Sequence, residues 1–417
     1  MTLPEELKAR GLVEHTSAEV EKIFAERRTV YIGTDPTGDS LHVGHLAWVL
    51  LMQRLANAGH SLVILVGGAT GMIGDPKEKG ERPLLDEATV KANARALDRQ
   101  LRGILKRTPF KMVNNADWLK KVDLISFLRD IGKHFTVNDL AKREVIARRL
   151  ANPDDSISYT EFTYPLLQGY DYLHLNKKLD CDVQIGASDQ WTNILSGVDL
   201  VRRKEGKEVF AFTIPLVTDA TGKKFGKSEG NAVWLDGNKT SPYAFYQFWM
   251  NLPDEKVEQY YKIYTFLPLE EIAAIMARHQ EAPQEREAQE ELARIMTEIV
   301  HGPAAAAQAA AATDALFGGR PFAELIAPER EAAAACAPSV RLSKRELVEG
   351  ASLVDALVVG GIANSKSDAR RLIEGKSVTL NDIVITAPDH KIYAGDLIGG
   401  YGLVRKGKRE VLVLVLK

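Results

Sequence analysis

The sequence is poor in cysteine, has no long apolar run and carries almost no net charge. Its 417 residues include only Cys181 and Cys336, which are far apart, so a disulfide framework and a cysteine-rich zinc site are excluded and a reducing compartment is indicated. No run of about 18 apolar residues is present and the charged N-terminus lacks a signal-peptide core, so we expect a cytoplasmic protein that enters no membrane. A net charge of −2 supplies no overall basic field for nucleic acid.

The stretch of residues 29–66 predicts a strand, a helix and a second strand. Residues 29–33 and 61–66 are apolar and β-prone, and residues 46–55 have the pattern of a buried helix. Such a unit is typical of a parallel sheet. Ligands bind beyond the carboxyl ends of these strands, where Asp35 and Asp75 are found. The GxGxxG spacing of dinucleotide-binding proteins is absent.

The turn before the helix contains an HxGH motif, formed by His42, Gly44 and His45. The two histidines are three residues apart and face the same way at the start of the helix, and Gly44 leaves the backbone bare. A helix N-terminus attracts phosphate, and two imidazoles there suit phosphates that gain charge during transfer. Two surface histidines on an ordinary helix are the alternative, because so short a motif also matches by chance.

A second candidate site is the loop KFGKS at residues 224–228. Its two lysines, three apart on a glycine-flanked loop, can neutralise the charge of a leaving pyrophosphate. Only three residues separate Gly222 from Gly226, so the P-loop spacing GxxxxGK[ST] fails by one residue. Taken alone, the loop would be interpreted as a solvated basic turn.

HVGH at the first helix and KFGKS after the last strand form the paired signature of class I aminoacyl-tRNA synthetases. In order along the chain, six segments resemble those of bacterial tyrosyl-tRNA synthetases: YIGTDPTGDSLHVGH, GGATGMIGDP, TEFTYPLLQGYDY, QIGASDQW, GKKFGKSEGNAVWL and TSPYAFYQFW. They are spread over residues 31–249, and the tail resembles the S4-type RNA-binding domain of that family. The resemblance therefore covers nearly the whole chain.

The resemblance and the order of elements together predict an α/β fold in three parts. We expect a Rossmann-like parallel-sheet catalytic domain at 1–235 with a helical insertion at about 76–180, and an α-helical anticodon-side domain at 236–326. A small α+β S4-like RNA-binding domain is expected at 343–417. The span 327–342 combines alanines with prolines and is predicted to be a linker.

The resemblance implies a tyrosine–tRNA ligase, which activates L-tyrosine with ATP to tyrosyl-adenylate and pyrophosphate and then transfers tyrosine to tRNA(Tyr). ATP is expected to arrive with Mg²⁺, and no protein-bound metal or organic cofactor is expected. The attacking carboxylate is already ionised, so neither a general base nor a covalent protein intermediate is required. Catalysis then consists of positioning and of charge stabilisation in the transition state.

One predicted helix carries Tyr164, Gln168 and Asp171 on a single face. An outward-facing polar surface is the alternative for such a trio. As a ligand site, Tyr31 and Asp171 can hydrogen-bond a phenol from two sides, one as donor and one as acceptor. The resemblance assigns the α-ammonium group to Asp75, Tyr164 and Gln168. Phenylalanine would leave a buried acceptor unpaired, which costs affinity and rejects that amino acid.

The resemblance assigns further roles residue by residue. Catalytic roles fall to Thr37, His42, His45, Lys79, Arg82, Lys224 and Lys227, with the four basic residues closing on pyrophosphate. Tyrosine binding falls to Tyr31, Asp75, Tyr164, Gln168, Asp171 and Gln184. ATP and ribose binding falls to Gly33, Asp35, Gly44, Asp189, Gln190 and Lys227.

Two positions depart from the commonest pattern of the family. Ile32 stands where many relatives carry a cysteine near the ribose, and it cannot donate a hydrogen bond. Trp48 stands where a smaller residue often lies on the first helix. We expect ATP binding to be weakened but present.

The tail has a local excess of basic residues, because residues 341–417 hold 13 Lys and Arg against nine Asp and Glu. This balance favours contact with RNA. A helix resembling the S4 recognition helix carries Lys366, Arg370 and Arg371, although a solvated helix face is the alternative. Arg202 and Arg203 are expected at the acceptor arm of tRNA. The resemblance also implies a homodimer with Tyr159 at its interface.

Three other functions compete with this interpretation. Tryptophanyl-tRNA synthetases have the nearest sister fold but no use for a Tyr31–Asp171 pair. An RNA-binding relative that lost its activity would not need HVGH, KFGKS and every tyrosine contact. A small-molecule nucleotidyltransferase can also use HxGH, but the helical domain and the S4-like tail are superfluous for that reaction.

Overall fold

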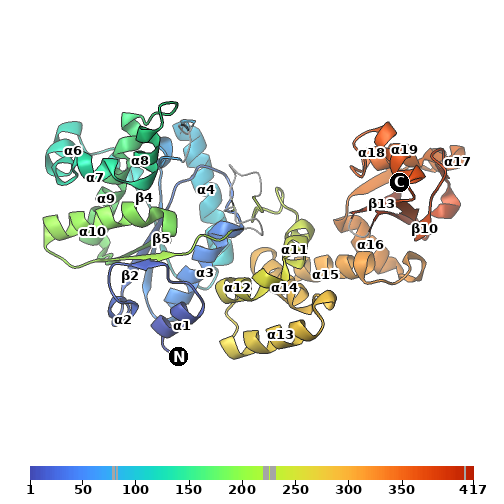
Figure 1. Ribbon diagram of the computed structural model, residues 1–417, viewed down its shortest axis with the longest axis horizontal. Helices are drawn as coiled ribbons and strands as arrows, with labels where there is room; N and C mark the ends of the chain where they lie inside the picture. The colour runs from blue at the N-terminus through green and yellow to red at the C-terminus, as the bar shows by residue number, and fades with distance from the viewer. Residues whose placement is uncertain (78–79, 81–82, 219–224, 226–231, 408–409) are drawn as a thin grey trace. The chain divides into compact units, whose positions relative to one another are not determined.

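The computed structural model describes residues 1–77, 80, 83–218, 225, 232–407 and 410–417 (Figure 1). The chain folds as two compact units. The first comprises Met1–Asp236 and Pro253–Glu281, and the second comprises Gly237–Leu252 and Ala282–Lys417. The predicted helical span 236–326 is therefore shared between the two units.

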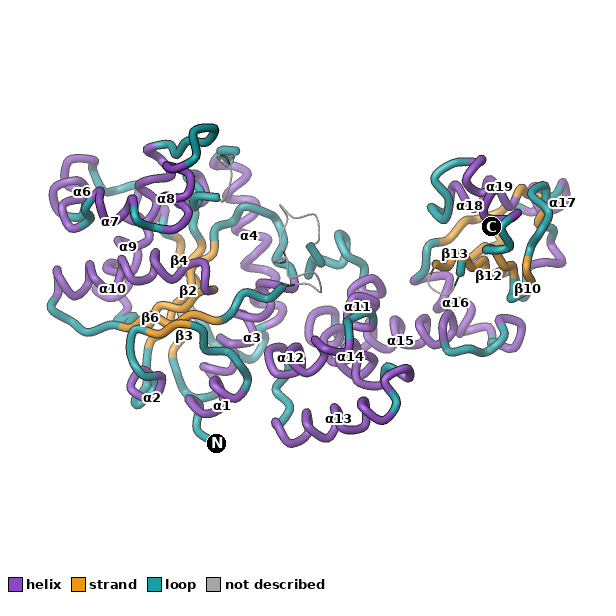
Figure 2. The backbone as a smooth tube through the Cα atoms, in the orientation of Figure 1, coloured by secondary structure: helices purple, strands orange, loops and turns teal. Residues whose placement is uncertain are grey.

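A six-stranded sheet forms the centre of the first unit, with helices on either side of it (Figure 2). The strand order is β1-β6-β5-β2-β3-β4, and every neighbouring pair is parallel except β1 with β6. The strands are β1 (His15–Thr16), β2 (Thr29–Thr34), β3 (Ser61–Val66), β4 (Lys111–Asn114), β5 (Val183–Ala187) and β6 (Phe210–Ile214). The Rossmann-like parallel sheet predicted from the sequence is confirmed.

The central strands are apolar along their length because helices cover both faces of the sheet. In β3, five of the six residues are buried, which is typical of a parallel strand packed on both sides. Helix α3 (Val43–Asn57) follows β2 and packs against β3, and α10 (Trp191–Glu205) packs against β5 and β6. The chain leaves β2 towards β3 on one side, while β5 pairs with the other side of β2. Such a reversal of strand order opens a crevice at the carboxyl ends of the strands.

The segment between β3 and β5 is mostly helical, as predicted. Its longest element, α9 (Tyr159–Leu179), begins at a capping box in which Ser158 and Glu161 bond each other's backbone N–H groups. The other helices are α4 (Glu87–Ile104), α5 (Ala116–Leu119), α6 (Leu124–Asp130), α7 (Val137–Ala141) and α8 (Glu144–Ala151). The first unit also contains α1 (Leu3–Ala9), α2 (Val20–Ile23), α12 (Asp254–Tyr264) and α13 (Leu269–Glu281).

The second unit begins with three helices that pack together, α11 (Pro242–Met250), α14 (Glu287–His301) and α15 (Pro303–Phe317). A five-stranded sheet of order β10-β9-β12-β13-β7 completes the unit. Its remaining elements are α16 (Ala327–Cys336), β7 (Ser339–Leu342), α17 (Lys344–Glu349), β8 (Ala351–Ser352), α18 (Leu353–Val359), α19 (Lys366–Glu374), β9 (Val378–Leu380), β10 (Ile383–Val384), β11 (Lys391–Ile392), β12 (Tyr401–Lys406) and β13 (Glu410–Leu416). The small α+β module expected at the C-terminus is confirmed.

One local prediction in this unit is wrong. The span 327–342, predicted to be a linker, forms α16 and β7, because Val340 and Leu342 point into the core and β7 pairs in parallel with β13. After β7 the chain forms two short helices, α17 and α18. Gly350 separates them with a φ of +85°, a conformation that residues with a side chain rarely adopt.

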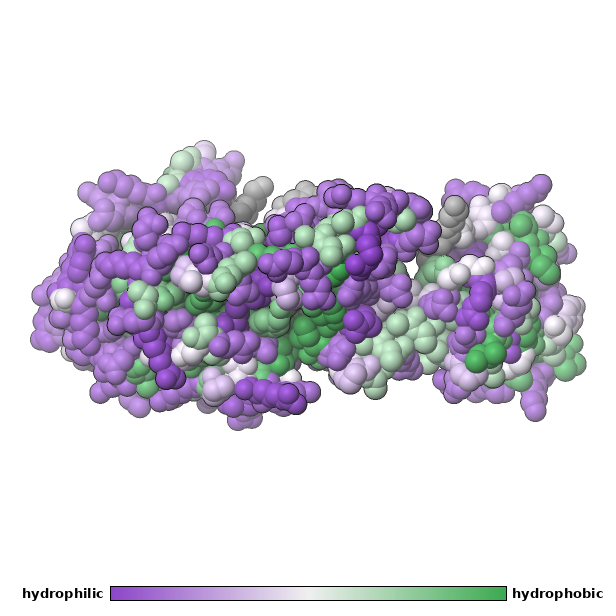
Figure 3. Space-filling model, turned by 90° about the horizontal axis from the view of Figure 1, so that it is seen from below, coloured by the Kyte–Doolittle hydropathy of each residue, from purple (hydrophilic) through white to green (hydrophobic). Residues whose placement is uncertain are grey.

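The face shown in Figure 3 is mainly hydrophilic, with separate areas of apolar side chains. Among the described residues, no helix has the length and apolar content needed to cross a bilayer.

Candidate active site

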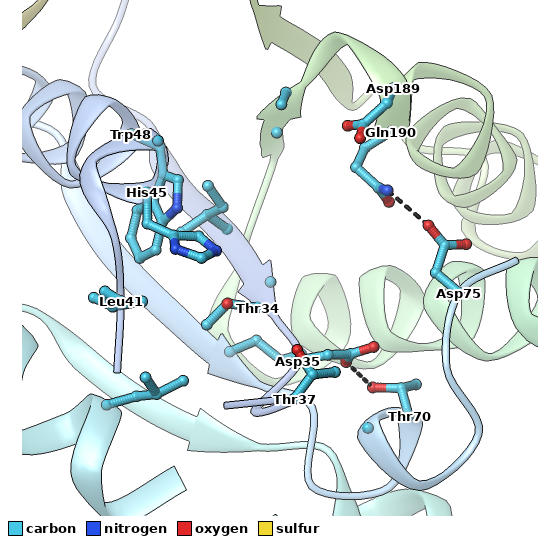
Figure 4. Close-up of a pocket in the computed structure, with 18 of the residues that line it drawn as sticks. Thr34, Asp35, Thr37, Leu41, His45, Trp48, Thr70, Asp75, Asp189 and Gln190 are labelled. Carbon is cyan, nitrogen blue, oxygen red and sulfur yellow. Dashed lines mark hydrogen bonds between the residues drawn. The ribbon is translucent and has the colours of Figure 1, made fainter. Parts of the chain in front are cut away.

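A cavity of about 680 Å³ opens at the carboxyl ends of the parallel strands in the first unit. Its walls come from the end of β2, the start of α3, the loop after β3, helix α9 and the turn after β5. Figure 4 shows His45 and Trp48 of α3 on one side, with Asp75, Asp189 and Gln190 on the other. This volume falls within the range of small-molecule sites.

Asp35 lies directly after β2 and is held from two directions. Thr70 donates its hydroxyl to Oδ1 at 2.7 Å, and Tyr164 donates its hydroxyl to Oδ2 at 2.9 Å. At position 67, just after β3, a Cβ atom would lie 1.9 Å from Asp35 Oδ1, so only glycine is compatible with this placement. The arrangement ties the carboxyl ends of β2 and β3 to helix α9.

Asp171 on α9 is buried and accepts two hydrogen bonds. Asn115 Nδ2 donates to Oδ2 at 2.9 Å, and Trp118 Nε1 donates to Oδ1 at 2.8 Å. Burial raises the pKa of Asp171 to about 7, although these two bonds act in the opposite direction. Each oxygen keeps a further lone pair, so the carboxylate can still accept a bond from a ligand hydroxyl.

Tyr31 and Gln184 bring buried polar atoms to the same cavity. The Tyr31 hydroxyl and Gln184 Oε1 have no hydrogen-bond partner among the described residues. Tyr31 packs edge-on against Tyr172 of α9, with the ring centroids 5.0 Å apart. Buried polar groups are nearly always paired, so unpaired ones that line a cavity indicate that a polar ligand completes the site.

Asp75, in the loop after β3, is held by two amide groups. Gln190 Nε2 donates to Oδ2 at 2.8 Å, and Asn193 Nδ2 donates to Oδ1 at 3.1 Å. Burial raises the pKa of Asp75 to about 6, and the negative charges of Asp35 and Asp189 contribute to the rise. A cationic ligand would offset this repulsion and stabilise the ionised form of Asp75.

The two histidines of the HVGH motif use the same ring nitrogen for internal bonds. His42 is the N-cap of α3, and its Nδ1 accepts from the backbone N–H of Gly44 at 3.1 Å. His45 Nδ1 accepts from the backbone N–H of His42 at 3.2 Å. A backbone N–H can only donate, so the proton of each neutral ring lies on Nε2. Both residues are therefore donors at Nε2.

Both imidazoles are neutral near pH 7. Desolvation by the surrounding protein lowers the pKa of His42 to about 4. The same effect, followed by the proximity of His42, lowers the pKa of His45 well below its usual value. The ring centroids are 3.8 Å apart. The site therefore offers two N–H donors in place of two imidazolium charges.

Gly44 and the residues around the lysine loop complete this side of the cavity. A Cβ atom on Gly44 would lie 3.0 Å from His42 Cε1 and 3.4 Å from Phe225 Cβ, so the glycine admits both side chains. The Val43 N–H donates to Val233 O at 2.9 Å, and the Leu235 N–H donates to Leu41 O at 2.9 Å. The chain that follows the KFGKS loop thus runs beside HVGH.

Most of the residues predicted for catalysis and small-ligand binding line this one cavity. They are Tyr31, Gly33, Asp35, Thr37, His42, Gly44, His45, Asp75, Tyr164, Gln168, Asp171, Gln184, Asp189 and Gln190. Ile32 and Trp48, the two departures, line it as well. Lys79, Arg82, Lys224 and Lys227 lie outside the described residues.

The residues predicted to contact RNA are exposed and are not among those that line the cavity. Arg202 forms an ion pair with Asp199, and Arg203 donates to His134 O at 2.9 Å. On α19 the exposed cations are Lys366, Arg370 and Arg371, of which the first and last form ion pairs with Asp355 and Asp368. Tyr159 is 74% exposed at the start of α9.

The sequence analysis missed three of the four side chains that hold the carboxylates of Asp75 and Asp171. Asn115 and Trp118 support Asp171, and Asn193 supports Asp75. Asn115 follows directly after β4, so the rule that ligands gather beyond the carboxyl ends of parallel strands pointed to it. No comparable signal marked Asn193, which lies within a helix.

Comparison with protein families divides the chain in two. Residues 25–318 match the family model of tRNA synthetases class I (W and Y). Residues 329–414 match the model of the tyrosine–tRNA ligase SYY-like C-terminal domain.

Similar proteins span the length of the chain. Tyrosine–tRNA ligase 1 of Vibrio parahaemolyticus is 42% identical over 98% of both chains, and the tyrosine–tRNA ligase of Roseiflexus castenholzii is 44% identical over 98% of both. Among solved structures, a C-terminally truncated mitochondrial tyrosyl-tRNA synthetase of Aspergillus nidulans is 31% identical. It has a TM-score of 0.68 and covers 76% of this chain and 94% of its own.

Proposed function

The chain belongs to the class I tRNA synthetase family of the tryptophan and tyrosine type, and we propose on that basis that it is a tyrosine–tRNA ligase. It activates L-tyrosine with ATP and then transfers the tyrosyl group to tRNA(Tyr). The family model covers both amino acids, but the match of the tail to a tyrosine–tRNA ligase domain and the curated relatives favour tyrosine.

One observation carries the choice of amino acid: a buried carboxylate (Asp171), a half-buried one (Asp75) and an unpaired tyrosine hydroxyl (Tyr31) face one cavity. Asp171 accepts a hydrogen bond from the substrate phenol, and the Tyr31 hydroxyl donates one to the same phenol oxygen. Asp75 binds the α-ammonium group, with Tyr164 and Gln168 beside it, and Gln184 offers its Oε1 as a further acceptor. Phenylalanine would leave the Tyr31 hydroxyl without a partner and would deprive Asp171 of its bond to the ligand, which costs affinity.

In the first step the tyrosine carboxylate attacks the α-phosphorus of ATP. An O–P bond forms to the carboxylate as the bond to pyrophosphate breaks. The Nε2–H groups of His42 and His45 donate to the phosphate oxygens that gain charge, together with Thr37. Neutral donors cannot balance the charge of pyrophosphate, so we assign that task to Lys79, Arg82, Lys224 and Lys227.

The nucleoside half of ATP lies along the strand ends. Gly33 and Gly44 leave room for the nucleotide, and Asp35, Asp189 and Gln190 face the ribose and the adjoining part of tyrosine. Magnesium arrives with the ATP phosphates. Among the described residues, no cluster of three or more His, Cys, Asp or Glu side chains could hold a metal ion.

The exposed basic residues suit the second substrate. Arg202 and Arg203 contact the acceptor arm of tRNA, and α19 contacts RNA through Lys366, Arg370 and Arg371. We further propose a homodimer in the cytoplasm. Its interface includes Tyr159 and the exposed apolar residues Leu124, Ile125, Val137 and Leu150, which are 56% to 74% exposed and would be covered by a partner chain.

The test is tyrosine-dependent exchange of pyrophosphate into ATP, followed by charging of tRNA(Tyr). Tyrosine should support exchange, and tryptophan and phenylalanine should not at equal concentration. Exchange with tryptophan alone would overturn the assignment, as would exchange without tRNA charging. Sedimentation that shows a stable, active monomer would remove the dimer.

A further inference from the structure

Arg143 does not line the cavity, but it contacts Asn193, the residue that holds Asp75. It is the N-cap of α8, in the helical segment between β3 and β5. Its Nη1 donates to Asn193 Oδ1 at 2.7 Å, and its Nη2 donates to Ser196 Oγ. Asn193 and Ser196 lie one turn apart on α10, so the guanidinium fork bridges two residues on one helix face.

The contact with Arg143 determines which way the Asn193 amide points. A guanidinium has five N–H donors and no acceptor, so only the amide oxygen of Asn193 can face it. The Asn193 NH₂ group is then left to donate to Asp75 Oδ1 at 3.1 Å and to Gln190 Oε1 at 3.3 Å. Without Arg143, the amide could rotate and place its oxygen against the Asp75 carboxylate.

We propose that Arg143 is a positioning residue for tyrosine binding: it orients the Asn193 amide so that an N–H group faces Asp75, and thereby keeps Asp75 anionic for the substrate ammonium group. The inference rests on the proposed function, since it assumes that Asp75 receives the α-amino group of tyrosine. The helical segment between β3 and β5 thereby gains a role in tyrosine binding, which the residues that line the cavity do not indicate by themselves.

The charges around Asp75 explain why the orientation of the Asn193 amide affects the ionisation of this carboxylate. Asp35 and Asp189 face it and disfavour its ionised form, while the neutral hydroxyl of Tyr164 is nearby and Lys77 lines the same cavity. The guanidinium of Arg143 makes no direct ion pair with Asp75 among the described contacts, but its positive charge and the Asp75 carboxylate favour each other through space. Burial lowers the pKa of Arg143 to about 10, so it stays protonated at neutral pH. An inverted amide would add an oxygen to this negative surrounding.

Arg143→Met removes every donor and keeps much of the side-chain length. In tyrosine-dependent pyrophosphate exchange at pH 7, we expect the KM for tyrosine to rise about tenfold while kcat and the KM for ATP change less than about threefold. The pH below which tyrosine binding fails should move upward by about one unit. Arg143→Lys retains a donor to Asn193 and should restore a large part of the affinity.

Three further variants distinguish orientation of the Asn193 amide by Arg143 from a role of Arg143 in side-chain packing alone. Arg148→Met, an exposed arginine on the same helix, should match the unsubstituted protein. Ser196→Ala removes the second guanidinium contact but leaves Asn193 bonded, so the KM for tyrosine should change less than about threefold. In an Asn193→Ala background, Arg143→Met should add little, because its effect passes through the missing amide.

Two results would overturn the inference. The first is a normal KM for tyrosine with a normal pH profile in Arg143→Met; the second is an equally large effect of that change in the Asn193→Ala background. Calorimetric binding of tyrosine to each variant gives the same comparison without turnover, and covers a variant with little activity. Failure of the unsubstituted protein to bind tyrosine would instead contradict the proposed function.

Discussion

The two ends of the cavity differ in the charge of their side chains: one end has carboxylates, and the other has neutral imidazoles. At the end that we propose binds tyrosine (the tyrosine end), Asp75 and Asp171 are carboxylates whose pKa values are raised to about 6 and about 7, and each accepts two side-chain hydrogen bonds. At the end that we propose binds the ATP phosphates (the phosphate end), His42 and His45 are neutral, and each accepts a hydrogen bond from a backbone N–H group at Nδ1. One end holds charge that a ligand must neutralise, and the other holds donors without charge.

This difference indicates that tyrosine binding and phosphate transfer depend on different electrostatic interactions. A carboxylate that is desolvated and lies beside other carboxylates favours a cationic ligand, because the ligand's charge offsets the repulsion between the carboxylates. Neutral donors of fixed tautomer need no reorganisation as charge develops on phosphate, which is how preorganised sites lower a barrier. Substitutions at the tyrosine end should therefore mainly change the affinity for tyrosine, and substitutions at the phosphate end should mainly change the rate.

The largest expected effect is on the rate, at the phosphate end. His45→Ala should lower kcat of tyrosine-dependent exchange by about 10²- to 10³-fold, the usual result of removing one preorganised donor. The KM for tyrosine should stay within about twofold. His45→Gln places an N–H near the position of Nε2 and should recover part of the rate. A rise in the KM for tyrosine equal to the loss of rate would break the comparison.

The next effect concerns affinity at the tyrosine end. Asp75→Asn and Asp171→Asn should each raise the KM for tyrosine by about 10- to 150-fold, since a hydrogen bond to a charged group contributes about 1.5–3 kcal/mol. Only Asp171→Asn should reduce the preference for tyrosine over phenylalanine, because both amino acids carry the ammonium group. Measurement of exchange with both substrates distinguishes the roles. Equal loss of selectivity in the two variants would contradict this division.

A smaller effect should appear as pH dependence. Binding of tyrosine should strengthen as pH rises from about 5.5 to 8, as Asp75 and Asp171 ionise at their pKa values of about 6 and 7. Neither histidine should titrate in this window, because the pKa of His42 is about 4 and that of His45 is also lowered. The KM for tyrosine should therefore carry the pH profile.

The same raised pKa values affect folding stability with a defined sign. Between the ordinary aspartate pKa and about 7, the folded, empty protein binds more protons than the unfolded chain, so stability falls as pH rises through this window. Thermal unfolding with and without tyrosine measures the effect. Stabilisation by tyrosine should grow from pH 5.5 to 8, and a constant increment would show that the two carboxylates do not titrate there.

The smallest effect is expected at Ile32, which lines the part of the cavity that we propose binds the nucleotide. Ile32→Cys restores a weak donor and should improve the apparent ATP affinity by about two- to tenfold, the range of a single neutral hydrogen bond. Ile32→Val removes a methylene group without adding a donor and serves as the matched control. Unchanged ATP affinity in the cysteine variant would show that the ribose does not contact this position.

Much of the site could be predicted because its residues sit at recognisable places in the chain. Asp35 and Asp75 follow strands, HVGH opens a helix, and Tyr164 and Asp171 share a helix face. These positions depend on local periodicity and on the general rule for parallel sheets. The central strands β2 and β3 were predicted to within a residue for the same reason.

The parts that could not be predicted depend on contacts between distant segments. Nothing near Asn193 indicates that its amide would face Asp75, 118 residues earlier in the chain. The neutral state of His42 follows from burial, which a motif does not report. At 327–342, alanine and proline content resembled a linker, and the two inward residues of β7 were too few to reveal a strand.

Strand β7 has a practical consequence for the isolation of the C-terminal α+β module. Residues Val413–Leu416 of β13 pair with Ser339–Leu342, so a fragment that starts at residue 343 would expose one side of β13 along four paired positions. Open edges of apolar strands recruit other chains. A truncation that starts before Ala327 keeps the edge covered and should yield monodisperse protein, whereas the shorter fragment should precipitate or self-associate on purification.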